Sequence, residues 1–295
     1  MNIAIIGSGG DGAGMNECLC SLCEKLKKHN VILFNYGFQG IIENNVANYT
    51  LEDLKLERKN GGIIIKSSRS SEFMTPKGFN KAISTLKKHK VDVLIVMGGN
   101  GSLAGTKELV GAGVKCVFIP TTIDNDIELS DYSIGFDTAV NNAVDFIQKV
   151  NTSMKAFDRT CIYEVMGRHC PDLAESVSQK VGASFCFIGK NKKSELCEAL
   201  KQAYKTNLAP IIVLQENTIP ADELKAWLQT KFKNRDFKVA VVGYVQRGGV
   251  ATDKELKMAK GFASQVVEVL KNERFNRLIK FDAQANEFVD IDINA

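Results

Sequence analysis

The feature that most constrains the fold is a unit that recurs along the chain: an apolar run of strand length, a glycine-rich or polar turn, and a stretch with helical periodicity. Several of these runs are apolar throughout, as strands covered on both faces are. Strands that alternate with helices in this way predict βαβ crossovers and parallel sheets. The runs are Ile3–Ile6, Val31–Asn35, Gly62–Ile65, Val93–Met97, Cys116–Ile119, Thr160–Val165, Ala183–Ile188, Pro210–Leu214 and Val239–Val242.

The number of strands predicts two sheets. About ten strands are many for a single open sheet. An amphipathic stretch from about Asp131 to Val150 marks a long helix at which the sheets divide. We therefore predict one domain from residues 1–135 plus about 250–290, and a second from residues 136–249. The turn GYVQRGG, Gly243–Gly249, is expected to return the chain to the first domain.

The composition excludes several classes of function. With 295 residues, 44% hydrophobic and 24% charged, the chain has the composition of an ordinary globular protein. A formal net charge of +4, scattered along the sequence, gives no reason to expect nucleic acid or a membrane as a partner. No apolar run is long enough to span a membrane, and the N-terminus MNIAIIG lacks signal-peptide features, so a cytoplasmic protein is expected.

The eight cysteines are expected to be reduced. Cys18, Cys20 and Cys23 lie together in CLCSLC, which raises the alternative of a metal site. On a helix, however, the three side chains point to different sides, and no second pair has ligand spacing. Small apolar core residues are the preferred interpretation.

Two segments that follow predicted strands are rich in glycine: GSGGDGAGMN, Gly7–Asn16, and GGNGS, Gly98–Ser102. Ligands bind beyond the carboxyl ends of parallel strands, and glycine lets the backbone approach an anion closely. The first segment lacks the GxGxxG spacing of dinucleotide folds and can bind a phosphate, bind a dinucleotide or merely turn. In the second, backbone amides and the Ser102 hydroxyl are expected to cradle a polyphosphate, the alternative being a plain turn.

Charged side chains follow other strands. Asp124 and Asp126 in PTTIDND would point to the same side of an extended loop, one as proton acceptor and the other toward a metal or hydroxyl, unless both are solvated or capping residues. Arginines near apolar runs recognise phosphate in bidentate fashion, or form structural salt bridges. They are Arg69, Arg159, Arg168 and Arg247. With the glycine loops, these residues indicate phosphoryl transfer to an acceptor that already carries a phosphate.

Seven blocks of the sequence resemble the bacterial 6-phosphofructokinases in order and spacing, over almost the whole chain. They are SGGDGAGMN, SSRSSEF, GGNGS, TIDNDI, IGFDTA, EVMGR and GYVQRGG. A GG-[DN]-G-[ST] loop alone also fits the NAD kinase and diacylglycerol kinase families, which lack the later blocks. The resemblance implies an α/β fold of two Rossmann-like three-layer domains with mostly parallel sheets, and an active site in the cleft between them. It also implies a homo-oligomer, dimer or tetramer, because in the family the partners of Arg159 and Lys238 reach in from a neighbouring subunit.

The same resemblance implies roles for individual residues. Asp124 matches the base that takes the proton from the sugar 1-hydroxyl, and Thr122 and Arg168 match the pair that stabilises the moving phosphoryl group. The ATP site matches Gly10, Arg69, Ser70, Gly99, Asn100, Gly101 and Ser102. The fructose 6-phosphate site matches Thr122, Asp124, Asp126, Arg159, Met166, Gly167, Arg168, Glu216, Lys238, Tyr244 and Arg247. Mg²⁺, the cofactor implied with ATP, is expected at Asp126 and Asn100.

Several positions depart from the family pattern. Asn100 stands where the family has an aspartate that faces the nucleotide's magnesium. An amide oxygen can bind the ion but brings no charge, and Mg²⁺ sites usually rely on one or two carboxylates plus phosphates. We therefore expect weaker binding of the metal–nucleotide complex, with Asp126 as the remaining carboxylate. Lys238 and Tyr244 replace an arginine and a histidine, which changes the acceptor site.

Further departures bear on the phosphoryl donor and on regulation. Thr121 stands where ATP users have glycine and pyrophosphate users have lysine, whereas Gly101 matches the ATP users. Both positions count against pyrophosphate as donor. Cys20 and Glu24 replace arginines of the family's effector site, and Glu24 repels a diphosphate. ADP and phosphoenolpyruvate are therefore expected to have no regulatory effect through that site.

Three hypotheses follow. The leading one is an ATP-dependent 6-phosphofructokinase of glycolysis, which forms fructose 1,6-bisphosphate and ADP with Asp124 as base. The second is a sugar-phosphate or nucleotide binding protein without turnover, motivated by Asn100 and the altered acceptor residues. The third keeps the kinase chemistry but has a different phosphorylated ketose as acceptor.

Overall fold

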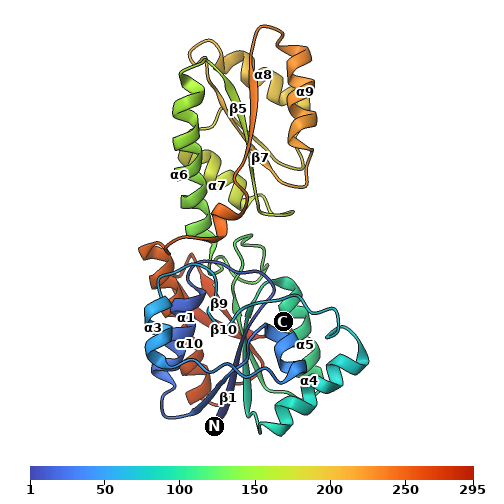
Figure 1. Ribbon diagram of the computed structural model, residues 1–295, viewed down its shortest axis with the longest axis vertical. Coiled ribbons are helices and arrows are strands. Elements are labelled where there is room, and N and C mark those ends of the chain that lie inside the picture. The colour runs from blue at the N-terminus through green and yellow to red at the C-terminus, as the bar shows by residue number, and fades with distance from the viewer. The chain divides into compact units, whose positions relative to one another are not determined.

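Alternate residues of strand β1 (Asn2–Ser8) enter two different hydrophobic cores. Ile3 and Ile5 belong to one, Ala4 and Ile6 to the other, and all four are fully buried. A strand buried on both faces lies inside a sheet that carries helices on both sides. In the computed structural model, which describes residues 1–295, this sheet forms the first of two units (Figure 1).

The first unit comprises residues Met1–Thr122, Asp126–Asp137 and Arg247–Ala295. Its further strands are β2 (Asn30–Leu33), β3 (Val93–Gly98), β4 (Cys116–Pro120), β9 (Arg277–Asp282) and β10 (Glu287–Asp292). Its helices are α1 (Met15–Lys25), α2 (Gly37–Glu43), α3 (Leu51–Glu57), α4 (Pro76–Lys88), α5 (Asn100–Gly111) and α10 (Asp253–Lys271).

The sheet of this unit has six strands in the order β10-β9-β4-β3-β1-β2. All neighbours are parallel except β10, which is antiparallel to β9. Buried side chains of α1, α3 and α10 share one core with the sheet, and those of α2, α4 and α5 share the other. The unit therefore has three layers, with the sheet in the middle.

The second unit comprises Ile123–Asn125 and Thr138–Gln246. Its strands are β5 (Thr160–Val165), β6 (Phe185–Phe187), β7 (Ile211–Gln215) and β8 (Phe237–Val241), and its helices are α6 (Phe136–Lys155), α7 (Asp172–Val181), α8 (Lys193–Ala203) and α9 (Ala221–Lys231). The strands are parallel, in the order β6-β7-β5-β8. Leucines of α8 and α9 pack on one face of this sheet, and Figure 1 shows α6 and α7 on the other.

The predicted fold class, α/β with two mostly parallel sheets, is confirmed. The predicted runs other than Gly62–Ile65 form strands, and their ends differ from prediction by at most two residues. The long helix begins at Phe136 and not near Asp131, and it ends at Lys155. No helix in the structure is both long enough and apolar enough to cross a membrane.

The prediction of a strand at Gly62–Ile65 is wrong. Ile63 and Ile65 are buried, but the segment turns, with the Lys66 N–H donating to the Ile63 carbonyl at 3.0 Å. The buried Asn16 side chain accepts the Ile64 N–H at 2.8 Å and donates to the Asn60 carbonyl at 3.0 Å. A side chain here satisfies backbone groups that a neighbouring strand would otherwise satisfy, so an apolar run is buried without joining the sheet.

Candidate active site

Three loops of the first unit begin side by side, because the strands that precede them are neighbours. The parallel strands β1, β3 and β4 are in a register that places Ser8 beside Gly98 and Gly98 beside Pro120. The chain leaves the sheet after each of these residues at the same edge, which is where ligands bind in open parallel sheets. The structure thus brings the two glycine-rich segments and the start of PTTIDND together.

Helix α5 begins inside the GGNGS segment, and no side chain caps its N-terminus. The first N–H groups of a helix have no partner within it and favour an anion. A methyl group at Gly98 would meet Ser102 Cβ at 2.5 Å and the Ser8 carbonyl oxygen at 2.8 Å, whereas one at Gly101 would meet nothing within 4 Å. Packing therefore requires glycine at position 98, while Gly101 leaves open space beside the first turn of the helix.

Residues Ser67–Ser70 lie against the first glycine loop. The Gly9 N–H donates to the Ser68 carbonyl at 3.2 Å, and the Ser67 hydroxyl donates to the Gly9 carbonyl at 2.9 Å. Arg69 is exposed beside this contact. A methyl group at Gly10 would meet nothing within 4 Å. Of the predicted donor residues, Gly10 and Arg69 therefore lie on two segments that hydrogen bonds join, with open space beside Gly10.

Two predicted donor-site serines have structural hydrogen bonds. The buried Ser102 hydroxyl donates to the Ser8 carbonyl at 3.0 Å and so joins the first turn of α5 to the end of β1. The Ser70 hydroxyl donates to Gln39 Oε1 at 2.6 Å and accepts the Phe73 N–H at 3.0 Å. The Ser102 bond differs from the predicted contact of this hydroxyl with a phosphate, because the hydroxyl proton is already donated to the Ser8 carbonyl. The backbone amides of α5 are the donors that the segment offers.

The two residues predicted to face Mg²⁺ contact each other. Asn100 Nδ2 donates to the backbone carbonyl of Asp126 at 2.9 Å. Since that oxygen can only accept, the bond fixes the amide orientation and leaves Asn100 Oδ1 for other contacts. Asp126 Oδ1 is buried and has no hydrogen-bond partner, which fits a cation. No group of three or more His, Cys, Asp or Glu residues could hold a metal alone, so phosphates and water would have to complete its coordination.

Asp124 and Arg168 form an ion pair in the second unit. Arg168 Nε lies 3.2 Å from Asp124 Oδ2, and the side chains are 48% and 6% exposed, respectively. The carboxylate is thus withdrawn from water, while the guanidinium remains accessible to a charged ligand. Thr122, two residues before Asp124 in the chain, belongs to the first unit, where a methyl group at Gly99 would meet its Cβ at 3.5 Å.

The expectation that the Asp124–Asp126 loop is extended is wrong. Asn125 has a left-handed backbone, with φ 54°. Alternate side chains share a side only where the residues between them are extended. The structure places Asp124 in the second unit and Asp126 in the first.

The turn that carries Arg168 is held by two side chains at the end of β7, the strand that pairs with β5. Gly167 and Arg168 both have positive φ, 123° and 49°. Glu216 Oε1 accepts the N–H groups of these two residues at 3.1 and 2.8 Å, and Gln215 Nε2 donates to the Arg168 carbonyl at 3.1 Å. A strained non-glycine residue persists only where its surroundings fix it, as these bonds do. Glu216, predicted to bind the acceptor, therefore uses Oε1 to shape the turn.

Sequence reasoning missed the structural role of two glutamines. Gln215 is buried at the end of β7, and Gln246 is fully buried within the 3₁₀ helix η1 (Gly243–Arg247). Gln246 Oε1 accepts the Met166 N–H at 2.9 Å, while its Nε2 has no hydrogen-bond partner. The only signal in the sequence was their position, since Gln215 directly follows the predicted strand Pro210–Leu214 and Gln246 lies in GYVQRGG.

Arg159 and Lys238 share a carboxylate at the opposite edge of the same sheet. Arg159 Nε lies 2.7 Å from Asp236 Oδ2, and Lys238 Nζ lies 3.1 Å from Asp236 Oδ1. Burial alone would raise the pKa of Asp236, but hydrogen bonds from Lys238 and Arg159 and their charges lower it below its ordinary value. Arg159 precedes β5 and Arg168 follows it, so a strand of six residues, roughly 20 Å long, separates the two arginines.

Of the remaining predicted acceptor residues, Met166 directly follows β5, whereas Tyr244 and Arg247 lie where the chain leaves the second unit and returns to the first. Met166 is partly buried, and Tyr244, on η1, is 78% exposed. Arg247 belongs to the first unit, where its Nη1 lies 3.7 Å from Asp11 Oδ1 in the first glycine loop.

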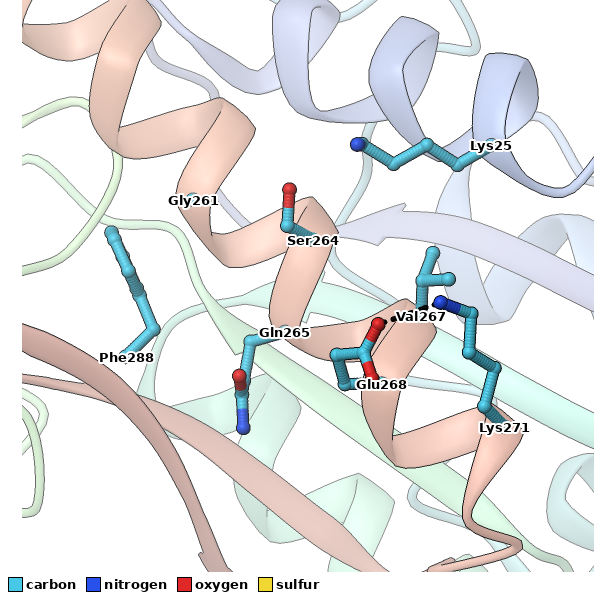
Figure 2. Close-up of a pocket in the computed structure, with 8 residues that line it drawn as sticks. All are labelled: Lys25, Gly261, Ser264, Gln265, Val267, Glu268, Lys271 and Phe288. Carbon is cyan, nitrogen blue, oxygen red and sulfur yellow. Dashed lines mark hydrogen bonds and ion pairs between the residues drawn. The ribbon is translucent and has the colours of Figure 1, made fainter.

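Helix α1 carries the residues that replace the family's effector arginines. Cys20 is buried in the core, and burial raises the pKa of its thiol. Glu24 lies 3.9 Å from Arg58, which also binds the buried Glu17. A hollow of about 520 Å³ lies beside the end of this helix, against α10 and β10. Figure 2 shows its lining, which includes Lys25 and none of the predicted site residues.

Two three-layer units with glycine loops at the carboxyl edge of the first parallel sheet define a doubly wound α/β protein of the Rossmann-like class. The phosphofructokinase family model matches residues 2–270. The chain belongs to the phosphofructokinase family.

Curated relatives agree with this assignment. The ATP-dependent 6-phosphofructokinase of Clostridioides difficile (strain 630) is 35% identical over 297 residues, which cover 99% of this chain and 92% of the relative. The ATP-dependent 6-phosphofructokinase of Oceanobacillus iheyensis is 34% identical, over 98% of this chain and 91% of the relative.

A solved structure shows the same fold. The phosphofructokinase of Pichia pastoris in the T-state superimposes with a TM-score of 0.91 at 24% identity, over 99% of this chain and 35% of that chain. A pyrophosphate-dependent phosphofructokinase from Marinobacter aquaeolei gives a TM-score of 0.86 at 16% identity, over 99% of this chain and 82% of that one. At such identities the likeness concerns the fold alone.

Proposed function

We propose that the chain is an ATP-dependent 6-phosphofructokinase, which transfers the γ-phosphate of ATP to the 1-hydroxyl of fructose 6-phosphate in glycolysis. Relatives with that name are 31–35% identical over nearly the whole chain. Thr121 and Gly101 differ from the residues expected of pyrophosphate users. The observation that carries the proposal is the pair formed by the buried Asp124 carboxylate and the accessible Arg168 guanidinium, 3.2 Å apart.

Asp124 is the base in this proposal. Its carboxylate takes the proton of the sugar 1-hydroxyl as that oxygen attacks the γ-phosphorus. The bond from the γ-phosphorus to the bridging oxygen breaks and ADP leaves, and a base in this role contributes about 10²–10⁴-fold to a rate. Arg168 neutralises charge on the phosphoryl group during its transfer, and the Thr122 hydroxyl donates a hydrogen bond to the same group. The sheltered position of Asp124 supports this role, because a base in solvent would be hydrated when it is needed.

The donor site proposed for ATP uses the backbone of the first unit. The uncapped N-terminus of α5, in the second glycine-rich segment, offers amides to the phosphates. Gly10 lies in the first glycine-rich segment, and the segment that carries Arg69 is hydrogen-bonded to it. Asp126 and Asn100 would hold the expected Mg²⁺, whose charge offsets that of the phosphates when it is bound. The buried Asp126 Oδ1 without a donor supports this assignment.

We also propose that the active protein is a homo-oligomer in the cytoplasm. Arg159 and Lys238 lie at the amino edge of the second sheet, and Arg168 and Glu216 lie at its carboxyl edge. One copy of this unit therefore does not present both sets to one small sugar phosphate. If both sets bind the acceptor, one of them comes from a second copy of the chain.

Shared sites have a direct test. Subunits with Asp124→Asn and subunits with Arg159→Met are each expected to be inactive as purified, and mixed oligomers are expected to regain activity. Light scattering would give the oligomeric state. A monomer, or a mixture that stays inactive although hybrids form, would contradict the proposed sharing.

The function itself is tested by incubating the purified chain with Mg²⁺, ATP and fructose 6-phosphate and detecting fructose 1,6-bisphosphate by mass spectrometry. Pyrophosphate in place of ATP should give no product. If wild type is inactive and Asn100→Asp is active, the chain is a weakened relative. Calorimetric binding of sugar phosphate without turnover in either protein would favour a binding protein, and a panel of phosphorylated ketoses would reveal a different acceptor.

A further inference from the structure

The residue after the proposed base has an unusual backbone that its own side chain helps to fix. Asn125 has φ 54°, in the left-handed region that asparagine tolerates better than most residues. Its Nδ2 donates a hydrogen bond of 3.0 Å to Asp172 Oδ2, and this bond is partly buried. Because Asn125 is bonded directly to Asp124, relaxation of its φ would turn the peptide that carries the base.

The acceptor of this hydrogen bond belongs to the segment that carries Arg168. Asp172 is the first residue of α7, and the turn before it is closed by a hydrogen bond from the Cys170 N–H to the Gly167 carbonyl at 2.9 Å. One carboxylate therefore links both members of the proposed catalytic pair. It reaches Asp124 through Asn125, and Arg168 through this turn.

Stabilisation of the helix dipole does not account for the contact. A carboxylate in the first turn of a helix is favourable wherever it points, and α7 has two of them, Asp172 and Glu175. Only Asp172 accepts a hydrogen bond from the loop that contains Asp124. Glu175 therefore provides a matched control, since it has the same charge in the same turn without that bond.

We propose that Asp172 is a positioning residue for phosphoryl transfer. It holds Asn125 in the left-handed conformation and thereby keeps Asp124 Oδ2 at 3.2 Å from Arg168 Nε. It exchanges no proton with the substrate, so its role requires an acceptor oxygen and not a negative charge. This inference rests on the proposed kinase function for its kinetic consequence, but its structural consequence can be measured without turnover.

The test compares Asp172→Ala, Asp172→Asn and Glu175→Ala in the full chain. Asp172→Ala is expected to lower kcat about 10²-fold, because a small displacement of a reacting group has an effect of this size, with the KM for ATP unchanged. Asp172→Asn retains an oxygen that can accept from Asn125, so it should keep the wild-type kcat. Glu175→Ala should also keep it. Among the three variants, only Asp172→Ala should show faster exchange of backbone amide hydrogens in a peptide that contains Asn125.

Each outcome decides the proposal. A loss of kcat in Asp172→Asn as large as in Asp172→Ala would show that the charge is required, and would overturn positioning. If Asp172→Ala has the kcat and the hydrogen-exchange rate of wild type, the positioning role is overturned as well. If the wild-type chain forms no bisphosphate, the proposed function fails, and the exchange comparison alone decides whether Asp172 holds the loop.

A second variant covers the case in which Asp172→Ala does not fold. Asn125→Ala removes the donor of the same bond and disfavours positive φ, so it should reproduce the loss of kcat and the faster exchange. Wild-type behaviour of Asn125→Ala would contradict the proposal.

Discussion

The two units fix the residues at their strand ends by opposite means. In the first unit the backbone does so: Gly98 packs where no side chain fits, and α5 begins without a cap. In the second unit side chains do so: Glu216 and Gln215 hold the turn at Arg168. A glycine loop offers many amides to a charged polyphosphate, whereas a clamped turn fixes one guanidinium against one carboxylate. The first arrangement is suited to binding and the second to chemistry.

The largest expected effect concerns the carboxylate of the clamped unit. Asp124→Asn removes the proposed base while it keeps the size of the side chain, so kcat should fall about 10²–10⁴-fold. The KM for ATP should change little, because the proposed donor site belongs to the first unit. Steady-state kinetics with direct detection of fructose 1,6-bisphosphate would measure both. A kcat within a few-fold of wild type would assign the base elsewhere.

The next effect tests the clamp itself. Glu216→Ala leaves the N–H groups of Gly167 and Arg168 without their acceptor, which should cost about 1–3 kcal/mol in the free energy of unfolding. The loosened turn should also lower kcat. Glu216→Gln keeps an oxygen at this position and should recover the stability, as urea unfolding of the three proteins would show. Equal stability of Glu216→Ala and wild type would mean that the turn needs no clamp.

The difference between the units also explains which parts of the site could be predicted from sequence. Glycine permits close backbone approach, so GGNGS and GSGGDGAGMN could be singled out from the sequence as candidate phosphate loops. A glutamine that holds a turn looks like any other glutamine, and Gln215 and Gln246 were missed for this reason. Asn125 shows the same limit: it combines a left-handed φ with a hydrogen bond to Asp172, a residue distant in sequence.

The fold shows a similar division. The strands that are apolar throughout were predicted because burial on both faces leaves a continuous hydrophobic run. The hairpin of β9 and β10 was missed, because RLIKFD and EFVDID alternate with charged residues and lie at the partly exposed edge of the sheet. At Gly62–Ile65 the run is apolar and partly buried, but Asn16 and not a strand satisfies the backbone.

A smaller effect on stability should distinguish a glycine that packing requires, Gly98, from one that has open space beside it, Gly101. Gly98→Ala would force a methyl group to 2.5 Å from Ser102 Cβ, and such overpacking should cost about 1–3 kcal/mol of stability. Gly101→Ala meets nothing within 4 Å and lies in a helix, so stability should be unchanged or rise by about 0.5–1 kcal/mol. If ATP phosphates occupy the space beside Gly101, the KM for ATP should nevertheless rise. Thermal unfolding and ATP titrations would reveal both, and an unchanged KM would place the phosphates elsewhere.

The smallest effect is expected at the amino edge of the second sheet, where Asp236 is paired with Arg159 and Lys238. The pKa of Asp236 is lowered in the folded protein, so the stability from these pairs is present above the unfolded-state pKa and lost as the pH falls through the folded-state pKa. The Asp236 side chain is 44% exposed, against 6% for Asp124, and water screens the pairs. Their contribution should therefore be below about 1 kcal/mol. Urea unfolding of wild type and Asp236→Asn from about pH 6 to about pH 3 should show a small difference that shrinks toward the acid end. A difference that stays constant over this range would mean that the ion pairs do not stabilise the fold, and that Arg159 and Lys238 are held there for a ligand alone.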